Sequence, residues 1–254
     1  MKLAITSFDG PDAAIPLVMA HGLFGSGRNL GALARHLARD RRVISVDMRN
    51  HGDSPWSDDH GYAALAGDLA GVIDDLGGRA HVFGHSMGGK AAMMLALTHP
   101  EKVARLVVAD IAPVAYGHSQ NGLIDAMEDL DRHDLTLRSE ADRRLSARIE
   151  DPGVRAFLLQ SLDMSANPAR WRFNLAALRD QMDRLVGWPD PAGQFDGPAL
   201  FLDGETSDYI QPSHHHDIRG LFPQAQITQI DGAGHWLHAE RPRQVEAAVA
   251  SFLS

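Results

Sequence analysis

The segment Gly84-His85-Ser86-Met87-Gly88-Gly89 decides the fold of this chain. It follows the apolar run 81–83 and precedes the helix-forming run 90–96, which places a serine where a buried strand turns sharply into a helix. The flanking glycines let neighbouring backbone approach where a Cβ would clash. Such a turn lifts the Ser86 hydroxyl clear of the sheet and leaves the Met87 N–H at a helix start, facing developing negative charge. Ser86 is therefore a candidate nucleophile and Met87 a candidate oxyanion donor.

Short apolar runs alternate with amphipathic stretches along the rest of the chain. This alternation is typical of an α/β fold in which a mostly parallel sheet has helices on both faces. Each run ends at a polar or turn-forming residue, as expected where buried strands reach the carboxyl edge of a sheet. The predicted strands lie at 17–20, 43–46, 81–83, 106–109, 199–202 and 227–230, with an edge strand within 2–8.

Helix signals lie between these predicted strands. Asn29 is expected to cap a helix whose apolar face carries Leu30, Leu33 and Leu37. Another apolar stripe ends at Gly77-Gly78, which favours a helix stop there. Pro242 is expected in the first turn of the last helix.

Residues 114–190 interrupt the alternation of strands and helices. They contain no strand-like run, and their apolar residues recur at helical spacing. Ser139 and Asp142 have the spacing of a capping box at the start of one of these helices. We interpret this segment as a helical cap over the carboxyl edge of the sheet, inserted between two parts of the core domain. The core is predicted to comprise 1–113 and 191–254.

A second oxyanion donor is predicted in His21-Gly22-Leu23-Phe24-Gly25, which follows the strand at 17–20. Gly22 allows the chain to turn back, so that the N–H of Leu23 can face Met87. The N–H of Phe24 is the alternative donor, and Leu23 is preferred.

The general base of a serine nucleophile is expected late in such a chain. Ile230-Asp231-Gly232-Ala233-Gly234-His235-Trp236 ends a strand, forms a glycine-containing loop and presents His235 before the final helix. The competing cluster His214-His215-His216 is interpreted as a solvated helix start, because contiguous histidines on a helix point in different directions and no carboxylate spacing completes a zinc site.

Two aspartates can supply the acid that orients the base. Asp110 ends the apolar strand 106–109, whereas Asp208 lies on the loop after the next predicted strand. Either loop could reach His235 and stabilise the imidazolium that forms there. Asp110 is preferred, and Asp208 stays open as the alternative.

Composition excludes several classes of protein. The chain has 254 residues, a formal charge of −9 and no basic run, which argues against binding nucleic acid. It has no cysteine, so a disulfide framework, a thiolate metal site and a cysteine nucleophile are all excluded. Neither a signal peptide nor a membrane span is predicted, so the expected location is cytoplasmic.

Four segments together resemble the α/β-hydrolase superfamily over nearly the whole chain. They are similar to a branch of small bacterial carboxylesterases and their mitochondrial relatives. In chain order they are His21-Gly22-Leu23-Phe24-Gly25-Ser26-Gly27, Asp47-Met48-Arg49-Asn50-His51-Gly52-Asp53-Ser54, Gly84-His85-Ser86-Met87-Gly88-Gly89 and Gly232-Ala233-Gly234-His235-Trp236.

The resemblance implies hydrolysis of acyl esters, sometimes thioesters, without a cofactor or a metal. It also implies a mostly parallel sheet with an antiparallel edge, a variable cap at 114–190, and a triad acid that maps onto Asp110. The chain departs from the branch at Asp208, which is acidic and is followed by Pro212 as in the wider superfamily. That departure keeps both aspartates as candidates.

Neighbouring residues have predicted roles around this site. His85 is expected to pack away from Ser86, since a residue beside the nucleophile on a strained turn points elsewhere. The turn at 47–54 is expected to tie loops together rather than to take part in catalysis. Phe24 is a candidate for the substrate pocket, and Trp236 could equally line that pocket or pack beneath its loop.

The leading hypothesis is a serine carboxylesterase that hydrolyses small to medium acyl esters through an acyl-enzyme intermediate. A perhydrolase, a C–C hydrolase and an acyltransferase are alternatives on the same fold, as is a ligand-binding protein without useful turnover. The expected partner is a small-molecule ester, and no feature of the sequence predicts an oligomeric state.

Overall fold

A seven-stranded sheet forms the centre of the computed structural model, which describes residues 1–11 and 14–254. Strand β1 runs antiparallel to β3, and all other neighbouring strands run parallel. The expected mostly parallel sheet with an antiparallel edge is therefore confirmed. In spatial order the strands are β1 (Ile5–Phe8), β3 (Val43–Val46), β2 (Leu17–Ala20), β4 (Ala80–His85), β5 (Val103–Ala109), β8 (Ala199–Gly204) and β9 (Ala225–Ile230).

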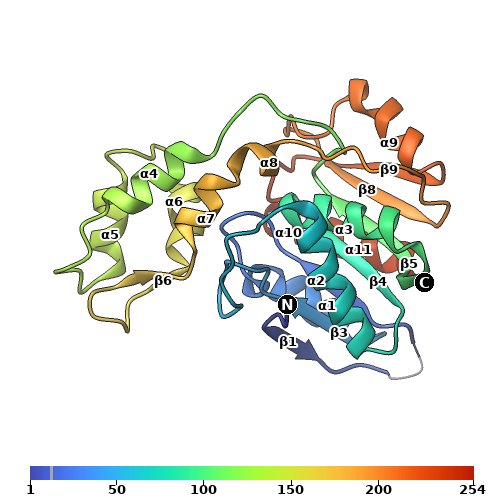
Figure 1. The fold of residues 1–254 in the computed structure, drawn as a ribbon, viewed down its shortest axis with the longest axis horizontal. Coiled ribbons are helices and arrows are strands. Elements are labelled where there is room, and N and C mark those ends of the chain that lie inside the picture. Colours follow the sequence, from blue (N-terminus) through green and yellow to red (C-terminus); the bar gives the residue numbers. More distant parts are fainter. Residues whose placement is uncertain (12–13) are drawn as a thin grey trace.

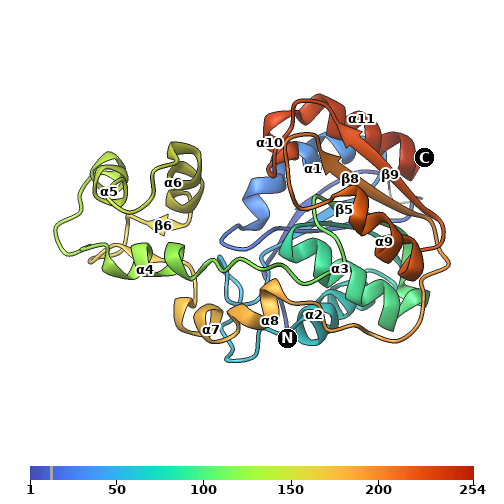
Figure 2. The ribbon, with the colours of Figure 1, turned by 90° about the horizontal axis from the view of Figure 1, so that it is seen from above.

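Helices cover both faces of this sheet (Figure 2). One face carries α1 (Gly31–Leu37) and α11 (Pro242–Leu253), and the opposite face carries α2 (Tyr62–Asp75), α3 (Met87–Thr98) and α9 (His215–Leu221). Strand β2 is buried from both sides because its side chains alternate between the two apolar clusters that these helices form with the sheet. The remaining short elements here are η1 (Gly27–Leu30), η2 (Pro100–Lys102), η3 (Pro212–His214) and α10 (Leu237–Glu240).

The chain order places a crevice at the carboxyl edge of the sheet. From β2 the chain first moves to β3 on one side and then to β4 on the other, so the loops after β2 and β4 diverge in opposite directions. In open α/β sheets, ligands bind at such a switch point. The predicted nucleophile and the predicted oxyanion loop both lie there.

Two predicted helix starts differ from the structure. Asn29 does not cap α1, because the chain enters the helix one turn earlier through η1, and Asn29 Oδ1 instead accepts a hydrogen bond from the Ser26 N–H at 2.6 Å. Helix α5 (Arg138–Leu145) has Leu137 at its N-cap, so Ser139 lies inside the first turn and provides no cap. The predicted boundaries at Gly77-Gly78 and Pro242 are confirmed.

The segment 114–190 forms a lobe beside the sheet (Figure 1). It is not entirely helical as predicted, since two-residue strands β6 (Leu162–Asp163) and β7 (Arg170–Trp171) pair antiparallel. Leu162 and Trp171 face each other across this ladder, and both are buried. In the sequence each of them continues the helical spacing of neighbouring apolar residues, which is why helices were predicted here. The division into a core and a cap domain stays a prediction. The helices of the 114–190 segment are α4 (Asn121–Asp129), α5, α6 (Pro152–Leu159), α7 (Leu175–Asp180) and α8 (Met182–Val186).

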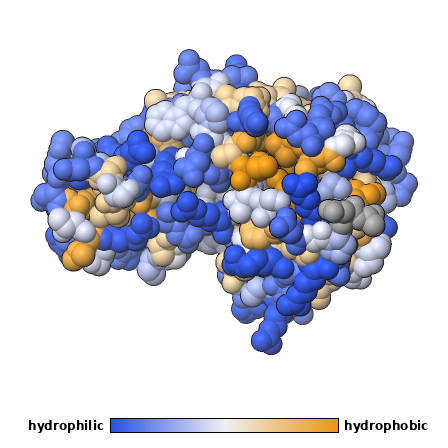
Figure 3. Space-filling view, turned by 90° about the horizontal axis from the view of Figure 1, so that it is seen from below, coloured by the Kyte–Doolittle hydropathy of each residue, from blue (hydrophilic) through white to orange (hydrophobic). Residues whose placement is uncertain are grey.

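The face of the molecule in Figure 3 is mostly polar. Figure 3 shows one face, on which hydrophilic residues surround an apolar area on the larger body. Across the described residues, no helix is both long enough and apolar enough to cross a lipid bilayer. The large apolar side chains that remain exposed are Met1, Ile5, Ile15, Trp56 and Leu137.

Candidate active site

Ser86 lies in a strained backbone conformation between β4 and α3. Its φ of 52° falls in the left-handed region that side-chain-bearing residues avoid. The turn is possible because a Cβ on Gly84 would lie 2.2 Å from the Gly88 carbonyl oxygen, and one on Gly88 would lie 2.5 Å from the Ala20 oxygen. The predicted glycine requirement therefore has a direct cause in backbone contact.

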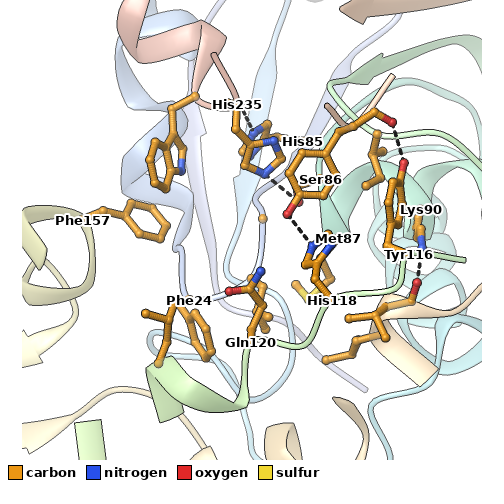
Figure 4. Close-up of a pocket in the computed structure, with 18 of the residues that line it drawn as sticks. Phe24, His85, Ser86, Met87, Lys90, Tyr116, His118, Gln120, Phe157 and His235 are labelled. Carbon is orange, nitrogen blue, oxygen red and sulfur yellow. Dashed lines mark hydrogen bonds between the residues drawn. The ribbon is translucent and has the colours of Figure 1, made fainter. Parts of the chain in front are cut away.

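Three side chains from distant stretches of the chain meet at this turn, and Figure 4 shows two of them, Ser86 and His235. The Ser86 hydroxyl donates to His235 Nε2 at 3.1 Å, and His235 Nδ1–H donates to Asp110 Oδ2 at 2.7 Å. Ser86 follows β4, Asp110 follows β5, and His235 lies on the loop after β9. The arrangement suits proton transfer from the serine to the imidazole, with a carboxylate behind the ring.

Asp110 is fully buried and firmly held. Its Oδ1 accepts from the Gly204 N–H at 3.0 Å, and its Oδ2 also accepts from the Ser207 hydroxyl at 2.5 Å. Asp208 is exposed and has no hydrogen bond or ion pair within the described residues. The structure thus brings Asp110 to His235 and leaves Asp208 outside the site.

Two backbone amides are available near the Ser86 hydroxyl. Gly22 packs closely on the turn, since a Cβ there would lie 3.2 Å from Ser86 Cβ. Within 1–11 and 14–254 no hydrogen bond occupies the amide of Leu23 or Met87. The Phe24 amide, by contrast, donates to His51 Nε2 at 3.2 Å. The geometry therefore favours Leu23 over Phe24 as the second donor.

Buried histidines hold the loops beneath these amides. His51 Nδ1–H donates to the Arg49 carbonyl oxygen at 2.9 Å, which leaves Nε2 as the acceptor for Phe24. Burial lowers the pKa of His21 to about 4 and that of His51 to about 3, so both rings are neutral. His21 Nε2 accepts from the Met48 N–H at 2.9 Å. These contacts are consistent with a loop-tying role for the turn at 47–54.

His85 and the histidine cluster at 214–216 lie outside the contacts of the nucleophile. His85 Nε2–H donates to the His235 carbonyl oxygen at 2.8 Å, so this side chain supports the loop rather than Ser86. The cluster spans the junction of η3 and α9, as predicted for a helix start. No group of three metal-ligating side chains occurs among the residues that the structure describes.

A cavity of about 310 Å³ opens over the Ser86 hydroxyl. Phe24 and Phe157 lie on one side of Ser86, and Lys90 and Tyr116 lie on the other (Figure 4). Phe24 and Trp236 both line this cavity, and the Trp236 ring packs 5.4 Å from that of Phe157. The 114–190 segment contributes much of the wall through residues that include Leu123, Val154, Phe157, Leu158 and Leu185.

Lys90 is a functional candidate that sequence reasoning missed. Its side chain is almost fully buried, and Nζ donates to the carbonyl oxygens of Val186 at 3.1 Å and Gly187 at 2.6 Å. The ammonium group lies 4.8 Å from the centre of the Tyr116 ring. Burial lowers the pKa of Lys90 to about 7. These contacts hold the end of α8 against the core. The one sequence signal for them is the presence of a lysine at the start of an apolar helical run.

A model of the alpha/beta hydrolase family matches residues 17–248 of this chain. The chain belongs to the alpha/beta hydrolase family. A solved structure titled "Marine microorganism esterase" superimposes on this alpha/beta hydrolase with a TM-score of 0.93, at 36% identity and 99% coverage of both chains.

Two curated relatives of this alpha/beta hydrolase are named as a lipase and an esterase. The mouse (Mus musculus) protein named sn-1-specific diacylglycerol lipase ABHD11 is 44% identical over 264 residues, covering 100% of this chain and 86% of that protein. Esterase YbfF of Escherichia coli strain K12 is 40% identical over 241 residues, covering 94% of this chain and 93% of that protein. The resemblance to small bacterial carboxylesterases and their mitochondrial relatives is therefore confirmed, and the chain is a hydrolase.

Proposed function

We propose that this alpha/beta hydrolase is a serine carboxylesterase with Ser86, His235 and Asp110 as its triad. The observation that carries the proposal is the continuous hydrogen-bonded series from Ser86 Oγ through the His235 ring to Asp110, at 3.1 and 2.7 Å. It lies beside two unoccupied amides and under a mainly apolar cavity. A nucleophile, a base, an oriented acid and oxyanion donors are the parts that acyl transfer requires.

Acylation follows from this geometry. Ser86 Oγ attacks the ester carbonyl carbon while its proton passes to His235 Nε2, and the carbonyl electron pair moves to the oxygen. The amides of Leu23 and Met87 stabilise that oxyanion, and Asp110 stabilises the imidazolium. When the tetrahedral intermediate collapses, the bond to the alkoxide breaks and His235 Nε2 returns the proton to the leaving alcohol.

Deacylation repeats these steps with water. His235 takes a proton from water as its oxygen attacks the acyl carbon, and the second tetrahedral intermediate releases the carboxylic acid. Ser86 Oγ recovers its proton from His235. No cofactor or metal takes part in this scheme.

The cavity favours acyl groups of small to medium size. Its volume of about 310 Å³ lies at the lower end of the range for small-molecule sites. The similarity to a protein named diacylglycerol lipase supports a carboxylic ester as the substrate, and thioesters stay within the proposal. We also propose that 114–190 acts as a cap, because it supplies much of the cavity wall, and that the protein is cytoplasmic.

The test combines one variant with one probe. We expect Ser86→Ala to lose hydrolysis of p-nitrophenyl acetate, and a fluorophosphonate to inactivate the wild type with an adduct on Ser86. Wild-type turnover by Ser86→Ala would end the proposal. A folded wild-type protein that forms no adduct would instead support the ligand-binding alternative. Product analysis in the presence of an alcohol or of hydrogen peroxide separates hydrolysis from acyl transfer and from perhydrolysis.

A further inference from the structure

The turn after β8 contacts both the proposed acid and the proposed base. Ser207 and Tyr209 belong to this turn and lie on either side of the exposed Asp208. Ser207 contacts Asp110, and Tyr209 contacts His235. Ser207 and Tyr209 therefore point toward the site, whereas Asp208 points outward. Neither Ser207 nor Tyr209 has a part in the proposed acylation and deacylation steps.

Tyr209 lies flat against the imidazole of His235. The ring centres are 4.1 Å apart and the ring planes are inclined by 24°, which is a stacked arrangement. The Trp236 ring is also close, but its centre is 6.0 Å away and its plane is inclined by 57°. Tyr209 therefore covers a face of the imidazole, whereas Trp236 does not stack on it.

Three contacts hold Tyr209 in this position. Tyr116 donates its hydroxyl proton to the Tyr209 carbonyl oxygen at 2.6 Å, and the Tyr209 hydroxyl lies 3.0 Å from His118 Nε2. The Tyr209 N–H donates to Ser207 Oγ at 3.3 Å. The stacked ring is thus fixed at its backbone and at its hydroxyl end.

Ser207 completes the connection to the acid. Its hydroxyl donates to Asp110 Oδ2, the same oxygen that accepts from His235 Nδ1–H. Together with the Gly204 N–H on Oδ1, this contact fixes the plane of the carboxylate. A carboxylate that could rotate would present a poorer acceptor to the imidazole.

Few other groups can compensate a positive charge on His235. The His85 ring from β4 packs against the His235 ring, and His238 from α10 packs against His85. Burial lowers the pKa of both His85 and His238, so neither carries a charge at neutral pH. Asp110 is the carboxylate in contact with the ring through Nδ1. The π face of an aromatic ring attracts a cation, and the attraction strengthens where water is excluded.

We propose that Ser207 and Tyr209 are positioning residues for the acid and the base. Ser207 fixes the orientation of Asp110, and the Tyr209 ring stabilises the imidazolium that forms when Ser86 transfers its proton to His235. This inference rests on the proposed function, because the imidazolium arises in that mechanism. It adds a second source of stabilisation, on the ring face, to the carboxylate at the ring edge.

The experiment compares pH profiles of kcat/KM for the wild type, Tyr209→Phe and Tyr209→Leu with p-nitrophenyl acetate. Leucine keeps apolar cover over the imidazole but has no π face, whereas phenylalanine keeps the π face and loses the contact to His118. We expect the acid limb of Tyr209→Leu to move to lower pH by about half a unit, since the imidazolium loses its stacking partner. The acid limb of Tyr209→Phe should stay at the wild-type pH.

A structural role alone would not produce this pattern. Trp236→Leu is the matched control, because it removes a neighbouring ring that does not stack, and its acid limb should not move. The ¹⁵N chemical shifts of the His235 ring give a readout without turnover, and should titrate at lower pH in Tyr209→Leu. If Tyr209→Leu does not fold by circular dichroism, Tyr209→Met provides the same comparison.

Ser207 is tested by a rescue. We expect Ser207→Ala to lower kcat about tenfold with little change in KM, and Ser207→Thr, which keeps the hydroxyl, to recover most of the loss. Unchanged acid limbs in Tyr209→Leu and Tyr209→Met, or unchanged kcat in Ser207→Ala, would overturn the corresponding half of the inference. If either result occurs while Ser86→Ala is inactive, the proposed function stands and the corresponding positioning role falls. Wild-type turnover by Ser86→Ala would overturn both the proposed function and the positioning roles.

Discussion

Strained backbone at single residues marks the carboxyl edge of the sheet. Phe24, Ser86 and Asp110 have φ values of 58°, 52° and 53°, and they follow the adjacent strands β2, β4 and β5. Such conformations cost of order 1–3 kcal/mol each and persist only where the surroundings enforce them. Here the enforcing contacts include the His51 acceptor for the Phe24 amide and the Leu202 acceptor for the Asp110 amide.

The identity of the acid is tested at this scale. We expect Asp110→Asn to lower kcat about 10⁴-fold, because an amide cannot maintain the imidazole tautomer that accepts the Ser86 proton. Asp208→Asn is the matched control and should retain wild-type activity, since Asp208 is exposed and lies outside the site. Steady-state kinetics on p-nitrophenyl acetate provide the measurement. The assignment is wrong if Asp208→Asn, rather than Asp110→Asn, loses activity.

A second residue-scale prediction concerns Asp203. Burial, and then the charge of Asp110, raises the pKa of Asp203 to about 6, and its buried Oδ1 has no hydrogen-bond partner among the residues that the structure describes. Between about pH 4 and about pH 6 the Asp203 carboxyl binds more protons in the folded protein than in the unfolded chain, so the contribution of Asp203 to the free energy of unfolding falls as the pH rises. We expect Asp203→Asn to be more stable than the wild type by about 1 kcal/mol at pH 8.

Urea unfolding at two pH values checks the Asp203 prediction. The stability difference between Asp203→Asn and the wild type should vanish near pH 4, where the wild-type carboxyl is protonated. Asp208→Asn again serves as the control, with no stability difference at either pH. Equal stability of Asp203→Asn and the wild type at pH 8 would contradict the prediction.

Sequence motifs could predict some of these residues and not others. Ser86 lies between Gly84 and Gly88, and His235 follows two glycines in the loop after a strand, and these local signatures predicted their placement. Asp110 and Asp208 both follow a strand, and only the three-dimensional path of the two loops separates them. Tyr209 has no such signature, because its contact with His235 depends on how β8 and β9 align.

At the scale of elements, backbone contact fixes how α3 docks on the sheet. Strands could be predicted from the sequence because their apolar runs are buried on both faces. Helix starts were less predictable, because the 3₁₀ turn η1 moved the first cap from Asn29 to an earlier residue. The spacing of apolar residues does not predict contacts such as that of Gly88 with the Ala20 carbonyl oxygen, although the sequence does show that a glycine occupies this position.

Two glycines in helices give an element-scale prediction. A Cβ at Gly88 would lie 2.5 Å from backbone oxygens of Ala20 and His21, so we expect Gly88→Ala to lower the free energy of unfolding by about 2 kcal/mol and to reduce turnover. A Cβ at Gly71 in α2 would meet no atom within 4 Å, so Gly71→Ala should raise stability by about 1 kcal/mol. Thermal unfolding of both variants is the measurement. Equal effects of the two changes would contradict the close-contact explanation.

At the scale of the whole molecule, several buried histidines are neutral. Burial lowers the pKa of His60 to about 2, that of His21 to about 4 and that of His238 to about 4. They lie on different elements around the site, so their titration affects the whole fold. The sequence shows 14 histidines but not which of them are buried, since that depends on loop packing.

These histidines predict sensitivity to acid. Below about pH 6.5 the unfolded chain binds protons at positions that stay neutral in the fold, so the free energy of unfolding falls as the pH falls. We expect a loss of about 3 kcal/mol or more between pH 7 and pH 5, measured by urea unfolding. His238→Gln should show a weaker pH dependence, whereas His216→Gln, which changes an exposed side chain, should keep the wild-type slope. A stability that is flat from pH 7 to pH 5 would contradict this prediction.

The position of β9 at the rim of the sheet has a kinetic consequence. Among the described strands, β9 pairs with β8 alone, and the loop that carries His235 follows β9 directly. After a stopped-flow jump out of urea, tryptophan fluorescence would follow collapse of the chain, whereas ester turnover can return only once β9 has joined its neighbour. A delay of ester turnover behind the fluorescence signal would therefore measure how long after collapse β9 pairs with β8.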